Sequence, residues 1–198
     1  MALVLILFLK VAMTVPQQVA TAHPEQIRPV RSGSIEAGKH ANDASHRAPP
    51  PVAIRIAAAG VNGLVETSEI SDGELAAPSG PWMVAWYVQT ARPGETGNVV
   101  MGGHVDYWDV GPAVFAGLGR LEKGAEIDVT DAAGNTYVYA VEWAREYSTA
   151  TLTPDQLREI VGPTEAPSLT LITCGGEFDI RQGEYPERLV VRAARIER

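Results

Sequence analysis

Apolar and polar residues alternate with a period of two along much of the chain from residue 52 onward, and this pattern predicts β-strands. Residues 52–56 show it first, with aliphatic side chains at every second position. The clearest hairpin is predicted over residues 126–143, where a turn at residues 131–135 separates two alternating segments. Further strands are expected at residues 82–88, 98–105, 168–174 and 188–196.

Helical signals are few. Residues 153–160 are predicted to form a helix, because they begin with an N-cap threonine and a capping-box glutamine, and a Gly-Pro pair follows at residues 162–163. A short helix is also expected at residues 111–118, and a turn at residues 59–63. At least six strands with so few helices predict an all-β domain, a barrel or a sandwich, over residues 52–198.

The N-terminus has a different pattern. Residues 1–9 form an unbroken apolar run, which is short for a membrane span of about 20 residues but suits the apolar region of a signal peptide. Residues 20–22, Ala-Thr-Ala, fit a small-residue cleavage site. We therefore predict that residues 1–22 are a signal peptide or an N-terminal membrane anchor and that the protein is exported to the extracellular face of the membrane. A buried core helix is the alternative, but the polar segment that follows would leave it nothing to pack against.

Residues 23–51 are predicted to be a disordered, proline-rich linker. The segment has five prolines, three of them at residues 49–51, and no aromatic residue. It cannot bury enough apolar surface to offset the entropy of ordering, so we expect an extended chain. The domain that follows, residues 52–198, is then the part that carries the function.

Composition narrows the classes of function. The 198 residues carry a formal net charge of −8, so binding to nucleic acid is not expected. There is one cysteine, which excludes an intramolecular disulfide and a four-cysteine zinc site. A single thiol is unusual in an exported protein, because free thiols oxidise outside the cell. No P-loop, HExxH pair or N-glycosylation sequon occurs.

The candidate chemistry consists of one histidine, one cysteine and one arginine. His104 and Cys174 are the only residues of their kinds within residues 52–198, and each stands where a predicted strand ends in a loop. Imidazole or a cation is what a cysteine nucleophile needs to hold its thiolate, and Arg188 could stabilise an oxyanion. Glycines 102, 103 and 175 are expected to leave room for a substrate backbone and to allow an unusual φ beside the sulfur. The alternatives are a buried structural cysteine, a hydrogen-bonded structural histidine and a solvated arginine.

Three segments resemble the signatures of the sortases, the cysteine transpeptidases of Gram-positive cell surfaces. They are GNVVMGGHVDY at residues 97–107, TLITCGG at residues 170–176 and ERLVVRA at residues 187–193. The spacing also fits, with 70 residues from His104 to Cys174 and 14 from Cys174 to Arg188. The resemblance extends from about residue 52 to residue 196, and the CGGEFD segment is more similar to the class F sortases of actinobacteria than to class A or class E.

The resemblance implies an eight-stranded sortase β-barrel in which His104, Cys174 and Arg188 carry catalysis. Arg181 lies in the same loop as Arg188 and is the competing arginine. The implied reaction cleaves a C-terminal LPXTG-like sorting signal through a thioacyl-enzyme intermediate and transfers the acyl group to an amine, with hydrolysis as a side reaction. The implied partners are the sorting-signal peptide and an amine acceptor, a cell-wall peptide or a pilin lysine. We expect no cofactor, no metal, a monomer, and contact with the membrane through the N-terminal segment alone.

Other interpretations are weaker. An L,D-transpeptidase-like enzyme shares the order of histidine and cysteine, but residues 171–173 do not match its cysteine motif. A non-enzymatic exported β-barrel that binds a partner is the remaining alternative, with a merely buried cysteine. An acid-rich stretch could bind calcium, but its spacing fits no EF-hand loop and a solvated acidic face is favoured. That stretch consists of Asp106, Asp109, Glu122, Glu126 and Asp128.

Overall fold

The computed structural model describes residues 47–197. The predicted signal peptide or anchor, residues 1–22, and the linker up to residue 46 lie outside the described residues. The last residues assigned to the linker lie against the domain: the Ala48 amide donates to Glu95 Oε1 at 3.0 Å, and the Pro50 carbonyl accepts from the Ala132 amide at 2.9 Å. No helix within residues 47–197 is long and apolar enough to cross a membrane.

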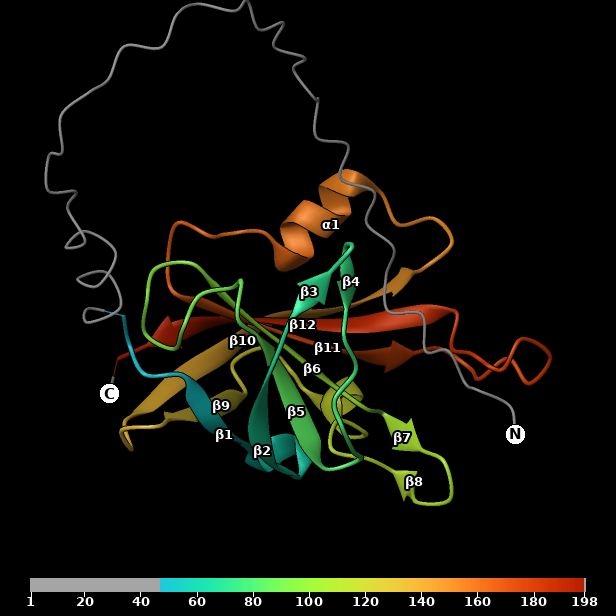
Figure 1. Cartoon of the computed structure of the whole chain (residues 1–198), viewed down its shortest axis with the longest axis horizontal. Helices are drawn as coiled ribbons and strands as arrows, with labels where there is room; N and C mark the ends of the chain where they lie inside the picture. The colour runs from blue at the N-terminus through green and yellow to red at the C-terminus, as the bar shows by residue number, and fades with distance from the viewer. Residues whose placement is uncertain (1–46, 198) are drawn as a thin grey trace, which may run out of the picture. The chain divides into compact units, whose positions relative to one another are not determined.

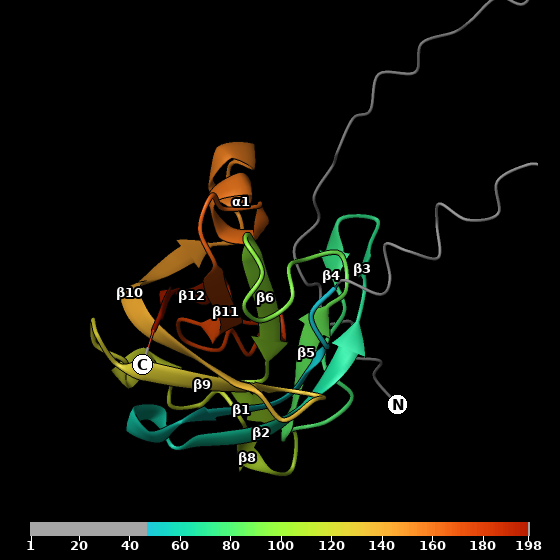
Figure 2. The ribbon, with the colours of Figure 1, turned by 90° about the vertical axis from the view of Figure 1, so that its left-hand side faces the viewer.

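Eight strands form a closed barrel in the order β1-β2-β5-β6-β11-β12-β10-β9 (Figures 1 and 2). Most neighbours in the barrel are antiparallel, but β2 with β5 and β6 with β11 are parallel. The expected eight-stranded barrel is therefore confirmed. The barrel strands are β1 (Pro51–Ile56), β2 (Val61–Ser68), β5 (Met83–Tyr87), β6 (Asn98–Gly103), β9 (Glu126–Asp131), β10 (Thr136–Ser148), β11 (Ser168–Gly175) and β12 (Glu187–Ile196).

Smaller elements decorate the barrel. Two short hairpins pair outside it, and one α-helix and two 3-10 turns complete the secondary structure of the described residues. In Figure 1 the helix lies over the strands at the top of the view, and the second hairpin projects from the lower edge. These elements are β3 (Ile70–Ser71) with β4 (Glu74–Leu75), β7 (Asp106–Tyr107) with β8 (Gly111–Pro112), α1 (Pro154–Val161), and the 3-10 turns Ala57–Ala59 and Leu118–Arg120.

The apolar residues at every second position of the strands fill the inside of the barrel, as the sequence predicts. Ile54 and Ile56 from β1, Ile127 and Val129 from β9 and Tyr139 from β10 are all buried in one apolar core. Because successive side chains of a strand point to opposite faces, the residues between these buried ones face outward.

A second apolar cluster lies on the outer face of the sheet. Ile172 of β11, Val190 of β12 and Tyr147 of β10 belong to it, together with Ile160 of α1 and Leu75 of β4. This cluster explains why the helix covers that face, since α1 buries Leu157 and Ile160 on one side. The same face of β11 and β12 carries the candidate site at its end.

Helix α1 begins directly after the predicted N-cap, ends one residue beyond the predicted range, and is held by buried polar groups. Thr153 caps it, and Thr153 and Gln156 form a reciprocal capping box. At the other end, Asn98 Nδ2 donates to the Ile160 carbonyl at 3.0 Å, and the Arg192 guanidinium donates to the Glu159 carbonyl. These bonds satisfy helix carbonyls that have no partner within the helix and fasten α1 to β6 and β12.

Two local predictions are wrong. Residues 111–118 form no α-helix: β8 begins them and Gly111 has φ of +85°, while Phe115 is buried in the barrel core. The turn expected at residues 59–63 ends at Gly60, and β2 starts at Val61. The Asn-Gly pair at residues 62–63 lies inside β2, where Asn62 and Gly63 pair with Arg55 and Ile54 of β1. Val114 packs so close to Gly63 that an added Cβ would lie 2.9 Å from Val114 Cγ2.

Candidate active site

Strand register brings the three candidate residues to one edge of the barrel. In the parallel pair of β6 and β11, Gly102 lies opposite Ile172, and His104 and Cys174 each follow two residues later. In the antiparallel pair of β11 and β12, Cys174 lies directly opposite Arg188. Cys174 therefore lies on the central strand of three, with the histidine strand on one side and the arginine strand on the other.

The Cys174 thiol is partly buried. Cys174 shares the outer face of β11 with Ile172, since the two are separated by one residue, and it is half-buried where the strand ends. Burial raises the pKa of the thiol above its ordinary value, the Arg188 charge lowers it, and the Asp106 charge raises it again. Burial is the largest of these influences, so the net effect of the surroundings is to favour the neutral thiol.

His104 occupies a buried position just after β6. Its side chain is 6% exposed, and its Nε2 lies 3.2 Å from the Pro78 carbonyl oxygen. The ring of Tyr107 meets the imidazole edge to face, with centroids 5.2 Å apart. The His104 carbonyl accepts from the Phe115 amide at 2.9 Å, which fixes the backbone where the strand leaves the sheet. The imidazole is thus held by packing on a rigid strand end.

Arg188 is held more firmly than Arg181. Its side chain is 7% exposed, and its Nη1 donates to the carbonyls of Tyr185 at 2.9 Å and Glu187 at 2.8 Å. Arg181 is exposed in the loop between β11 and β12, where its amide donates to Asp179 Oδ1 at 2.8 Å. The structure therefore brings Arg188, and not Arg181, into the strand pair with Cys174.

A hydrogen bond that the sequence did not predict joins the two loops beside Cys174. The Tyr185 hydroxyl donates to Asp106 Oδ2 at 2.5 Å, across 79 positions of the chain. Burial, followed by this bond and the Asp106 charge, raises the pKa of Tyr185 to about 12. Asp106 carries no local sequence signal for this role, because its partner belongs to a distant loop.

The glycines near the site serve packing more than access. An added Cβ at Gly102 would lie 2.5 Å from the Tyr87 hydroxyl, and at Gly103 it would lie 2.3 Å from the Phe115 ring. The expectation that this pair leaves room for a substrate backbone is therefore wrong. The unusual φ predicted beside the sulfur belongs to Gly176, at +76°, and not to Gly175.

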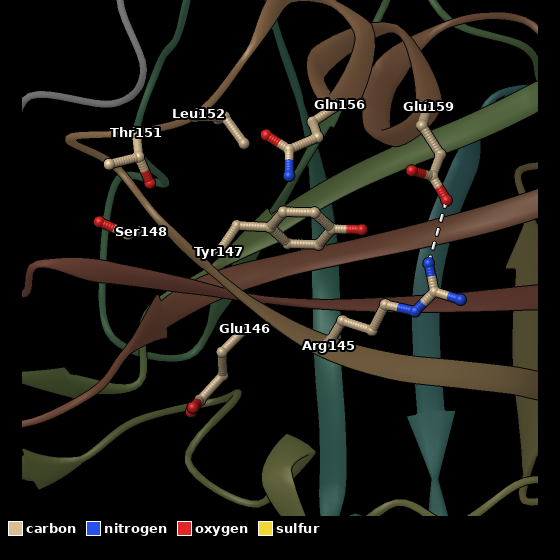
Figure 3. A pocket seen from close by; sticks show the side chains of 8 residues that line it. All are labelled: Arg145, Glu146, Tyr147, Ser148, Thr151, Leu152, Gln156 and Glu159. Atoms are coloured by element: carbon tan, nitrogen blue, oxygen red, sulfur yellow. Dashed lines mark hydrogen bonds and ion pairs between the residues drawn. The ribbon is translucent and has the colours of Figure 1, made fainter.

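A cavity of about 430 Å³ opens between the end of β10 and α1 (Figure 3). Arg145 Nη1 lies 3.2 Å from Glu159 Oε1 on one of its walls, and the Tyr147 ring lies across it below Gln156. A much smaller cavity of about 10 Å³ shares Tyr147 with it and is also lined by Arg188. The two cavities have Tyr147 and Leu152 in common, and of the two only the smaller is lined by Arg188.

The Tyr147 hydroxyl is buried and finds no hydrogen-bond partner among residues 47–197. We predict that Tyr147→Phe raises the free energy of unfolding by about 1 kcal/mol, because it removes an unsatisfied polar atom and keeps the ring. The control is Tyr87→Phe, which removes a hydroxyl that donates to the Ala76 carbonyl at 3.0 Å and should lower stability by about the same amount. Urea unfolding of both variants measures the difference; equal losses would contradict the prediction.

Within residues 47–197, no group of three or more histidine, cysteine, aspartate and glutamate side chains is arranged to hold a metal ion. The acid-rich stretch is instead spread over several elements. Asp106 lies in β7, bonded to Tyr185, while Asp128 lies in β9, 3.8 Å from Arg55 Nη1. The chemistry that this site can perform with its own residues is that of a thiol between an imidazole and a guanidinium.

A family model described as Sortase domain matches residues 54–196. The solved structures similar to the chain include a sortase D5 transpeptidase of Clostridium perfringens, with a TM-score of 0.55, 19% identity, and coverage of 79% of this chain and 86% of that one. Sortase A of Corynebacterium diphtheriae is similar with a TM-score of 0.58, 17% identity, and coverage of 85% and 73%. Sortase A of Listeria monocytogenes has a TM-score of 0.55, 19% identity, and coverage of 75% and 88%. At these identities the likeness concerns the fold. None of the curated proteins compared with the chain matches it.

Proposed function

Since the chain belongs to the sortase family, we propose that it cleaves a C-terminal, LPXTG-like sorting signal at the cell surface and transfers the acyl group to an amine. The observation that carries this proposal is the strand register of Cys174, which lies opposite Arg188 on one side and next to the strand of His104 on the other. Family membership sets aside the L,D-transpeptidase alternative. The half-exposed position of the thiol also argues against a binding module with a merely buried cysteine.

In the first half of the reaction, the Cys174 thiolate attacks the carbonyl carbon of the scissile peptide bond. The carbon–nitrogen bond breaks as His104 gives its proton to the leaving amine, and a thioester forms. In the second half, the acceptor amine attacks the thioester, His104 takes its proton, and the thiolate leaves with a new amide bond made. Water in place of the amine gives hydrolysis as the side reaction.

Arg188 has two roles in this proposal. Its charge opposes the burial that raises the thiol pKa, so it favours the reactive thiolate. Its guanidinium also supplies donors for the oxygen of the substrate carbonyl as negative charge develops on it. The carbonyls of Tyr185 and Glu187 hold the guanidinium in place before substrate arrives.

The surroundings of the enzyme are part of the proposal. We expect the exported domain to act as a monomer at the extracellular face of the membrane, with the sorting signals of surface proteins as acyl donors. A cell-wall peptide or a pilin lysine is the expected acceptor. The resemblance to class F sortases stays a prediction, and so do the N-terminal anchor or signal peptide and the linker.

Incubation with a library of sorting-signal peptides and an added amine tests the function. Mass spectrometry should detect three species: the enzyme carrying an acyl group on Cys174, the released C-terminal fragment, and the peptide joined to the amine. Peptides that share the cleaved position then define the motif. If no peptide of the library is cleaved and no acyl-enzyme forms, the proposed function is wrong.

We predict that Arg188→Lys lowers kcat by about 10²–10³, because lysine keeps the charge but loses the planar set of donors. Arg181→Lys is the matched control in the loop that precedes β12, and it should leave kcat nearly unchanged, since Arg181 is exposed. Steady-state kinetics of the two variants decide between the arginines. If Arg181→Lys loses kcat and Arg188→Lys does not, Arg181 is the essential arginine and the assignment of Arg188 is wrong.

A further inference from the structure

We propose that Asp106 is a positioning residue for this reaction. Through the Tyr185 hydroxyl it fixes the loop whose carbonyl oxygens hold the Arg188 guanidinium beside Cys174. The inference rests on the proposed function, because it assigns a task to a residue outside the histidine, cysteine and arginine of the site.

The Asp106–Tyr185 hydrogen bond joins the two segments that flank Cys174. Asp106 lies in β7, two residues after His104, and Tyr185 lies three residues before Arg188. The bond of 2.5 Å therefore links the histidine side of the site to the arginine side. The Phe178 ring packs edge to face against Tyr185, with centroids 5.1 Å apart, and orients the phenol within the loop.

The bond reaches Arg188 through the backbone of residues 185–187. The Tyr185 and Glu187 carbonyls both accept from Arg188 Nη1. Between them, the Pro186 carbonyl accepts from the amide and the hydroxyl of Thr149, both at 2.9 Å. Glu187 is already part of β12, whereas Tyr185 precedes the strand. Loss of the Asp106 bond therefore leaves Tyr185 less firmly held, and with it the Tyr185 carbonyl that accepts from the Arg188 guanidinium.

The charges of Asp106 and Arg188, which the Tyr185 loop connects, shift the pKa of the Cys174 thiol in opposite directions. Burial raises the pKa of the thiol, and on top of burial Arg188 lowers the pKa while Asp106 raises it. Removing the Asp106 charge should therefore lower the thiol pKa. Removing the Tyr185 hydroxyl should raise it, because Arg188 is held less closely and the Asp106 charge loses its hydrogen-bond donor.

The first experiment measures the rate of Cys174 alkylation by iodoacetamide from pH 5 to pH 10 in the full chain. We expect Asp106→Asn to shift the profile to lower pH and Tyr185→Phe to shift it to higher pH. A role in folding alone would move both profiles in one direction or neither, and either result would overturn the proposal. This readout needs no substrate, so it keeps its meaning if the proposed function fails.

The second experiment measures transfer. Asp106→Ala and Tyr185→Phe should each lower kcat/KM by about tenfold, mostly through kcat, as expected for loss of a hydrogen bond to a charged group. The double variant should be no slower than the worse single variant, because both substitutions break the same link. Asp106→Asn should recover most of the rate, since its amide oxygen can still accept from Tyr185. Losses that multiply in the double variant, or unchanged rates in the single variants, would overturn the proposal.

Two control variants match these changes. Asp109→Asn removes a carboxylate from the exposed turn between β7 and β8, where Asn tolerates the φ of +60°. Tyr137→Phe removes a similar tyrosine–aspartate bond, from the Tyr137 hydroxyl to Asp131 at 3.1 Å, near the end of β10 away from Tyr147. Both should keep the parent kcat/KM. A loss in the Tyr137 variant equal to that of Tyr185→Phe would indicate general loosening and would overturn the proposal.

Discussion

Cys174→Ala is expected to abolish both cleavage of a sorting-signal peptide and transfer to an amine, because the variant has no nucleophile. It should also keep its fold. The side chain is half-buried at a strand end, and replacing its sulfur by hydrogen removes a burial energy of about one CH₂ group, ~0.8 kcal/mol. The hydrogen bonds of β11 are made by its backbone and are unaffected.

Three measurements check this result: the product yield, the mass of the enzyme after incubation with peptide, and the thermal unfolding temperature. The parent enzyme should gain the mass of the acyl group and the variant should not. Turnover above a few per cent of the parent rate would contradict the nucleophile assignment. A large drop in unfolding temperature would instead call for Cys174→Ser as the comparison, which keeps a polar atom of similar size.

His104→Ala should lower kcat by about 10²–10⁴, the usual contribution of a positioned general acid and base, with little change in substrate binding. His104 is the one imidazole within residues 52–198. The pH profile of kcat/KM for the parent enzyme should be bell-shaped. The rate rises with pH as the thiol, whose pKa burial raises, becomes a thiolate, and it falls as the imidazole loses the proton that it must donate.

A substrate with a thioester in place of the scissile amide separates this role from a structural one. Its leaving group needs no proton, so acylation of His104→Ala by the thioester should be nearly as fast as acylation of the parent. A flat pH profile from pH 5 to pH 9, or an equal loss with the thioester, would show that His104 does not transfer the proton.

Local patterns were sufficient for most of the strands. The alternation in residues 126–143 predicted β9 and β10, since a strand with one buried face takes on a period of two. Residues 168–174 were also expected as a strand and form β11, which is buried on both faces along most of its length. Capping chemistry predicted α1, because the Thr153 and Gln156 side chains act within a single turn. The TLITC and GGHVD segments also predicted the family, which the family model confirms.

The sequence predicted the wrong secondary structure where tertiary contacts outweigh the local preference of the residues. Residues 111–118 have helix-forming composition in part, yet Phe115 is drawn into the barrel core and the segment stays irregular. The Asn-Gly pair at residues 62–63 reads as a turn, but it lies in β2, paired with β1 on one side and close to β5 on the other. A short stretch of sequence does not contain these partners.

The sequence by itself determined the chain order of His104, Cys174 and Arg188, their strand-end positions and the family, because each depends on residues that are neighbours along the chain. The tertiary structure decided which residues meet. The pairing of β6, β11 and β12 selected Arg188 over Arg181 as the cross-strand partner of Cys174. The same pairing brought Asp106 to Tyr185 across 79 positions. It also buried the thiol and so raised its pKa. Contacts between distant segments form only when the barrel closes, and no local pattern of side chains records which loops will then lie side by side.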